Sequence, residues 1–154
     1  MEQKQASRIR LLADERGVSA IEFALIVPII VLMAIATLDL GHGLYRSMQV
    51  QVAAEAGAQT AVARRGFDEN SIVQAVTTST NFTSIEAIPA PQEFCGCPAS
   101  TGVSVIDCKL KCASGLAPGK YVTVSAQGTY NTLIPYLFLP SSYQLKAQST
   151  VRVQ

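Results

Sequence analysis

The sequence predicts an α+β protein: one long N-terminal membrane-spanning helix, followed by a small exported domain with an antiparallel β-sheet that is stapled by disulfides. Three observations predict this fold. An apolar run of 21 residues contains one charge, four cysteines lie close together in the second half, and polar and apolar residues alternate in the last third. The expected boundaries are 1–17 for a cytoplasmic leader, 18–65 for the helix and 66–154 for the exported domain.

Composition argues against several classes of protein. The 154 residues carry a formal charge of +1 without a Lys/Arg cluster, so nucleic-acid binding has little support. Tryptophan is absent and His42 is the single histidine. Because no nucleophile motif, phosphate loop or His-based metal motif occurs, we expect no catalytic residues, no metal and no cofactor. His42 is interpreted as a polar residue at the membrane exit.

The apolar run, residues 18–38, has the length of a transmembrane helix. At about 1.5 Å per residue it spans roughly 30 Å, the thickness of one hydrocarbon core. Four basic residues precede the run, whereas the first one beyond it is Arg46. The positive-inside rule therefore places the N-terminus in the cytoplasm and everything after about Asp39 outside. Pro28 is tolerated, since neighbouring membrane helices can satisfy the freed carbonyl.

Glu22 is the only charged residue in this run. A carboxylate one turn inside a membrane helix costs about 3 kcal/mol of insertion free energy, so we expect it to have a charged partner or a functional role. The rival interpretation of the run is a cleaved secretory signal with its cut after Ala34-Ile35-Ala36. The two differ in the mature amino terminus, which is Val18 for the retained helix and Thr37 for the removed signal.

The helical pattern continues beyond the membrane, through the part 39–65. Residues 53–63 contain six alanines and Gly57, which predicts a smooth face for close packing with other helices. Gly66 is the first plausible stop, and the alternative is a break near Gly41-His42-Gly43. Four apolar residues of this part recur at i+4 spacing, and its polar residues lie off that line. The apolar residues are Leu40, Leu44, Met48 and Val52.

The start of the chain resembles the prepilin class. A short basic leader ends in Gly17, Glu22 and Phe23 stand at the fifth and sixth positions after it, and one long apolar helix follows. The stretch ERGVSAIEFALIVPIIVLMAIATLDLGHGLY is similar to the TadE-like proteins of the tight-adherence (Tad) pilus system. The resemblance covers residues 15 to about 65, and the remainder matches only in general plan.

The resemblance implies a minor pilin or pseudopilin of the bacterial inner membrane. A prepilin peptidase would cut after Gly17, and Glu22 would neutralise the amino group of Val18 in a neighbouring subunit. Phe23 occupies the position where the major pilin usually carries tyrosine. The implied partners are other pilins, the peptidase, the assembly platform and membrane lipid. The alternatives are an uncleaved membrane anchor of an exported binding domain, and an anchored zinc or thiol-redox enzyme.

The exported half begins with a short helix that Asp68-Glu69-Asn70-Ser71 caps and that ends near Thr78. A strand is expected near 82–88. Four cysteines in an oxidising compartment favour two disulfides, in which Cys95 and Cys97 bridge to Cys108 and Cys112 in a nested or a crossed pattern. A four-thiolate zinc site is the alternative.

Three further strands are expected, at Val103–Ile106, Lys120–Tyr130 and Tyr143–Val153, with the last two forming an antiparallel pair. The apolar segment 133–140 lies between them and is too short and too interrupted by proline to cross a membrane. It either packs over the sheet as core or forms an exposed patch that touches the bilayer or another subunit.

Overall fold

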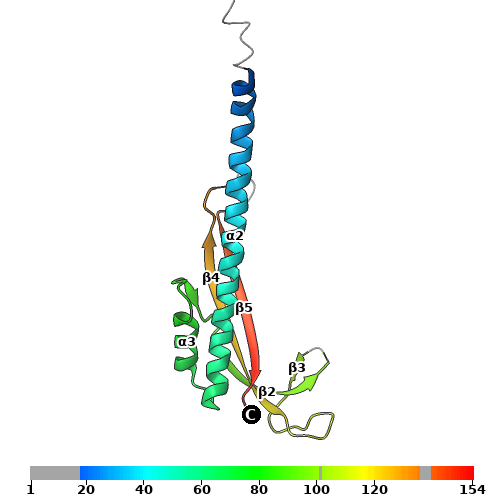
Figure 1. The fold of residues 1–154 in the computed structure, drawn as a ribbon. Helices are drawn as coiled ribbons and strands as arrows, with labels where there is room; N and C mark the ends of the chain where they lie inside the picture. Colours follow the sequence, from blue (N-terminus) through cyan, green and yellow to red (C-terminus); the bar gives the residue numbers. More distant parts are fainter. Residues whose placement is uncertain (1–17, 101, 136–139) are drawn as a thin grey trace, which may run out of the picture. The chain divides into compact units, whose positions relative to one another are not determined.

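The computed structural model describes residues 18–100, 102–135 and 140–154 (Figure 1). A long helix, α2 (Val18–Arg64), precedes a short one, α3 (Glu69–Thr78), and then the strands of one sheet. The chain divides into two compact units, one ending at Gly41 and the other running from His42 to Gln154. The predicted α+β class, with a long apolar helix, an antiparallel sheet and two disulfides, is confirmed.

Helix α2 runs for 47 residues without interruption through Pro28 and through Gly41 and Gly43, so the expected alternative of a break does not occur. Its end differs from the prediction in one detail. The left-handed residue that terminates the helix is Arg65, with φ of 51°, rather than Gly66. The backbone N–H of Arg65 donates to the carbonyl of Val62 at 3.1 Å, which closes the last turn.

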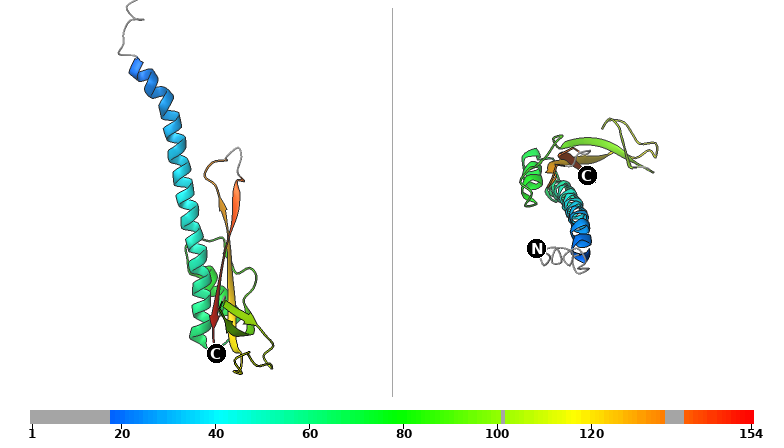
Figure 2. Two further views of the ribbon diagram at one scale, coloured as in Figure 1. Left: turned by 90° about the vertical axis from the view of Figure 1, so that its right-hand side faces the viewer. Right: turned by 90° about the horizontal axis from the view of Figure 1, so that it is seen from above.

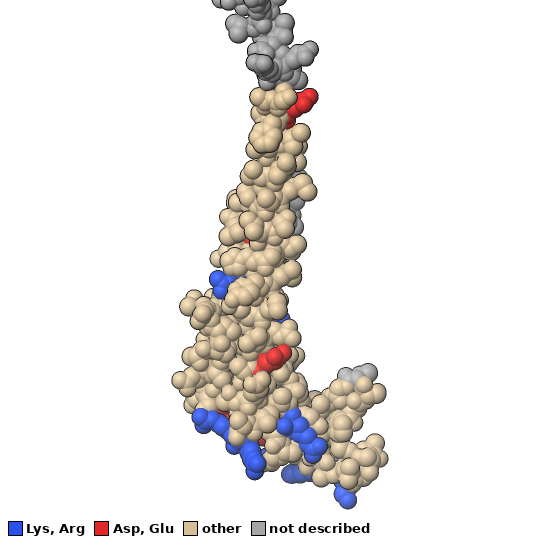
Figure 3. Space-filling view, in the orientation of Figure 1, with Lys and Arg blue, Asp and Glu red and all other residues tan. Residues whose placement is uncertain are grey.

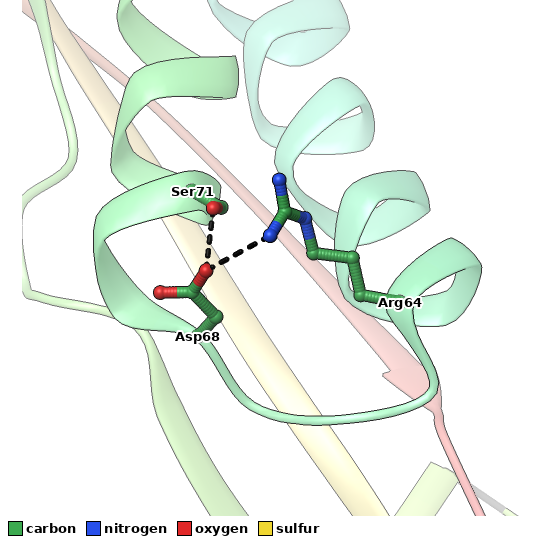
Figure 4. Close-up of polar contacts among 3 residues, drawn as sticks. All are labelled: Arg64, Asp68 and Ser71. Carbon is green, nitrogen blue, oxygen red and sulfur yellow. Dashed lines mark hydrogen bonds and ion pairs between the residues drawn. The ribbon is translucent and has the colours of Figure 1, made fainter.

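Helix α3 starts at the N-cap residue Asp68, as the sequence predicts. One carboxylate oxygen of Asp68 accepts a hydrogen bond from the Ser71 hydroxyl and pairs with Nη1 of Arg64 at 3.1 Å (Figure 4). The Ser71 hydrogen bond is the largest cause of a lowered pKa at Asp68, and Arg64 lowers the pKa further. The cluster thus ties the end of α2 to the start of α3.

The sheet has five strands: β1 (Ile85–Glu86), β2 (Gln92–Ala99), β3 (Gly102–Val105), β4 (Gly119–Asn131) and β5 (Ser142–Arg152). The order is β1-β4-β2-β3, and β5 also pairs with β4. The predicted antiparallel pair is confirmed, with an unbroken register from Tyr121 opposite Arg152 to Asn131 opposite Ser142.

The other strands differ more from the sequence analysis. The strand expected near 82–88 is reduced to the two residues of β1. Strand β2 was missed, because Pro91, Gly96 and Pro98 interrupt the alternating pattern there. It forms nonetheless because both of its edges are paired, with β4 on one side and β3 on the other.

The core lies between the sheet and the part of α2 that follows His42, with α3 beside that helix (Figure 2). Small side chains let the helix approach the sheet closely: the nearest atoms to a Cβ built on Gly57 would be Cγ2 of Val76 at 2.7 Å and Cγ1 of Val124 at 2.8 Å. The buried cluster consists of Val50, Ala53, Ala54, Ala58, Ala61, Ile72, Val76, Phe82, Ile85, Val122, Val124 and Ala126.

Replacing Gly57 by alanine tests this close approach. Overpacking against Val76 and Val124 is expected to cost about 1–3 kcal/mol, whereas the better helix propensity of alanine returns up to about 1 kcal/mol. We therefore expect Gly57→Ala to lower the free energy of unfolding by about 1–2 kcal/mol, measured by denaturant titration of the full chain in detergent.

Gly41→Ala is the matched control, since nothing lies within 4 Å of a Cβ built at that position. Its stability should be unchanged or slightly raised. Equal stability of the two variants would contradict the packing described for Gly57.

Candidate functional site: the long helix and its surfaces

The residues singled out at the start of the chain lie on the first turns of α2. The helix begins at Val18, Glu22 follows one turn later with an exposed side chain, and Phe23 is 67% exposed. Gly17 lies outside the described residues. The helix therefore presents the Glu22 carboxylate outward and supplies it with no ionic partner among the described residues.

Apart from Ser19, Glu22 and Thr37, the surface of α2 from Ser19 to Leu38 is formed by apolar side chains. Figure 3 shows this end of the helix free of Lys and Arg side chains. The helix is long and apolar enough to cross a membrane, which fits a single-pass anchor. Large apolar side chains stand exposed around it: Ile21, Leu25, Ile26, Ile29, Ile30, Val31, Leu32, Met33 and Leu38.

A polar cluster occupies the next turns of α2. Arg46 donates through Nε to Nε2 of His42 at 3.2 Å and through Nη1 to Oε1 of Gln49 at 3.0 Å. The Arg46 guanidinium also lies 4.5 Å from the centroid of the Phe82 ring. The ring of His42 lies 5.8 Å from that of Tyr130. His42 thus acts as a hydrogen-bond acceptor in a packing arrangement, which fits a structural role for this residue.

The part of α2 that follows His42 buries, in the protein's own core, the face that the sequence analysis assigned to partner helices. Ala53, Ala54, Ala58 and Ala61 are at most 1% exposed, because they pack on the protein's own sheet. The expectation that this alanine and glycine face packs with other helices is therefore wrong for these residues. Periodicity locates a smooth face but does not say which neighbour covers it.

The larger side chains remain uncovered instead. Leu44, Met48 and Val52 are 60%, 66% and 51% exposed, and we call these three residues the apolar stripe. Leu40, which continues the same line, is 67% exposed. A shallow groove runs beside the stripe, lined by Tyr45, Met48, Gln49, Val52, Ser79, Thr80 and Asn81.

The disulfides join Cys95 to Cys108 and Cys97 to Cys112, which is the crossed pattern. All four thiols of the chain are thereby used, so none is left as a thiolate for zinc or as a redox pair. The bridges close a loop whose apolar side chains at Val105 and Leu110 are 70% and 57% exposed. This loop is fixed by covalent bonds rather than by a core of its own.

The apolar segment 133–140 is only partly described. Leu133 is 57% exposed. Residues 136–139 lie outside the described residues, so the choice between core and exposed patch stays a prediction for them.

Residues 17–59 match the family model of the TadE-like proteins. This segment is TadE-like. The resemblance inferred from Gly17, Glu22, Phe23 and the apolar helix is thereby confirmed for this segment. No curated protein and no solved structure matches the chain.

The TadE-like segment includes the first turns of α2, the apolar anchor, the polar cluster around Arg46 and the apolar stripe. It ends before the last turn of α2, so α3, the sheet and the disulfide loop lie outside the match.

Proposed function

We propose that the chain is a minor pilin or pseudopilin that takes part in assembly of a Tad-type pilus. The observation that carries the proposal is that one segment is both TadE-like and an exposed helix of membrane-spanning length. In this proposal 1–17 is a cytoplasmic leader, 18–38 spans the inner membrane and 66–154 is exported. The partners are other pilins, a prepilin peptidase, the assembly platform and membrane lipid.

Glu22 supplies the register between subunits. Cleavage after Gly17 would create an ammonium group at Val18, one helical turn from Glu22. In a low dielectric each charge is costly alone, and the two attract strongly when they come from neighbouring chains. The attraction is strongest when the amino terminus of one helix lies level with Glu22 of the next, which fixes the axial offset of the helices.

The apolar stripe supplies lateral contact outside the membrane. Because the small-residue face is already covered by the core, the exposed Leu44, Met48 and Val52 are among the helix side chains left for a neighbour. Burying one such side chain contributes about 1.5–3 kcal/mol. The stripe and the apolar segment 18–38 belong to the same helix, α2.

Processing is tested by mapping the amino terminus of the membrane-bound protein, with and without the cognate peptidase. We expect Val18 as the mature terminus, because cleavage there frees the ammonium group that Glu22 needs. Gly17→Ala should block cleavage and retain the 17-residue leader. Gly41→Ala, a change on the same helix, should be cut normally. A mature terminus at Thr37, or an intact leader in the presence of the peptidase, would overturn the processing step.

The role of Glu22 is tested by Glu22→Gln, which keeps the shape of the side chain and removes its charge. We expect normal cleavage and membrane insertion but at least about tenfold less assembled pilus, since a loss of 1.4 kcal/mol is a factor of ten. The measurement is sheared-pilus yield per cell. Glu55→Gln is the control, because Glu55 is an exposed glutamate farther along the same helix. Equal yields from both variants would remove Glu22 from the assembly step.

The stripe is tested by Met48→Glu. The side chain is exposed, so the free energy of unfolding should change by less than about 0.5 kcal/mol. Association with partner pilins should fall about tenfold, as judged by co-purification and pilus yield. Ser47→Glu places the same charge on an exposed neighbouring position of the helix. If it impairs assembly as strongly as Met48→Glu, the added charge rather than the stripe is responsible.

A further inference from the structure

The sheet has one long open edge. Strand β4 pairs with β1 and β2 along one side and with β5 along the other. Among the described strands β5 pairs only with β4, so its second edge is unpaired over eleven residues, Ser142–Arg152. At about 3.3 Å per residue, that edge is roughly 36 Å long.

The hydrogen bonds between β4 and β5 determine which backbone groups of β5 face the open edge. Just beyond β5, the N–H of Val153 donates to the carbonyl of Lys120, and just before β5 the carbonyl of Ser141 accepts from the N–H of Thr132. Successive residues of a strand direct their N–H and C=O groups to opposite edges. The odd-numbered residues of β5 therefore bond to β4, and the even-numbered residues direct their N–H and C=O groups to the open edge.

The edge lacks most of the features that prevent strand addition. Natural edge strands are short, or contain proline, bulges or several charges. The edge strands β1 and β3 are short, with two and four residues. Strand β5 has no proline, its register with β4 is unbroken, and Lys146 is the one charge in its interior.

The two faces of β5 differ in chemistry. On the inner face, Leu145, Ala147 and Val151 pack against the core but remain only partly buried. On the outer face, neutral side chains bond across to β4: Gln144 accepts from Gln127 at 2.6 Å and donates to Thr129 at 3.1 Å. The outer face also carries the cations Lys146 and Arg152, six residues apart, with no carboxylate on β5 to balance them.

We propose that the open edge of β5 accepts an extended segment of another protein as an added strand of the sheet. The chemistry of the segment follows from the two faces. Apolar residues at every second position would cover Leu145, Ala147 and Val151, and carboxylates six residues apart on the other face would lie opposite Lys146 and Arg152. Main-chain hydrogen bonds give affinity in this mode of binding, and the alternating side chains give selectivity.

A second copy of the chain fits the edge poorly. Antiparallel pairing of two β5 strands would gather Lys146 and Arg152 of both copies on one face, with no carboxylate on either β5 to balance them. Parallel pairing about a two-fold axis would set the apolar row of one copy beside the polar row of the other. The inference does not depend on processing at Gly17.

The test uses the full chain in nanodiscs and a synthetic probe. The probe is an eleven-residue peptide with valine at every odd position, glutamate at the second and eighth positions and threonine elsewhere. In the free protein, the amides of Gln144, Lys146, Gln148 and Thr150 should exchange with solvent faster than those of the odd-numbered residues of β5. Saturating peptide should slow exchange at these even positions at least tenfold and leave β3 unchanged.

Two variants distinguish peptide binding at the open edge of β5 from nonspecific peptide binding elsewhere on the protein. Gln148→Pro removes one open-edge N–H without touching a bond to β4, and should weaken peptide binding at least tenfold. Lys146→Gln should weaken it several-fold, whereas Lys109→Gln, a change at an exposed lysine of the disulfide loop, should not. The proposal fails if a shuffled peptide slows the same amides equally, or if the even amides stay unprotected. Protection that rises with protein concentration alone would identify a second copy as the occupant and would also overturn it.

Discussion

The close approach of α2 to β4 is the contact on which the rest of the unit from His42 to Gln154 depends. It brings Gly57 against Val76 and Val124, and Val50 near Gly128 of β4. Helix and strand can come this close only where side chains are small, so the alanines of 53–61 form the interface of the core. Because that face packs against the sheet, the larger side chains of the helix lie on its other faces. The exposed stripe is thus a consequence of how the core is packed.

The sequence was sufficient for the features that local chemistry determines. Length and hydropathy located the membrane helix, Asp68 located the start of α3, and alternation located β4 and β5 within one residue at each end. The TadE-like resemblance could be read from Gly17, Glu22 and Phe23 because those residue types are unusual in that position. Each of these signals comes from residues that are close in the sequence, so it can be recognised without knowledge of the tertiary contacts.

Features that depend on distant partners could not be predicted in the same way. Strand β2 contains Gly96 and Pro98 in a pattern typical of a loop, and it is a strand because two neighbours pair with it. The face of α2 that enters the core was assigned to the wrong partner, since a smooth helix face suits a sheet as well as another helix. The residue that ends α2 was also misplaced, because Arg65 adopts the left-handed conformation normally taken by glycine. In the first two cases the tertiary neighbour decided the outcome.

The crossed disulfides have a topological consequence. The segment between Cys97 and Cys108 lies inside both covalent loops, since one bridge spans Cys95 to Cys108 and the other spans Cys97 to Cys112. Breaking either bridge leaves that segment enclosed by the other. Val105, which is exposed within that segment, is therefore held by redundant links, whereas Lys109, Leu110 and Lys111 lie only inside the loop that the Cys97–Cys112 bridge closes. Release of the segment between Cys97 and Cys108 requires two chemical steps, so this segment is protected against partial reduction in a way that two side-by-side bridges would not provide.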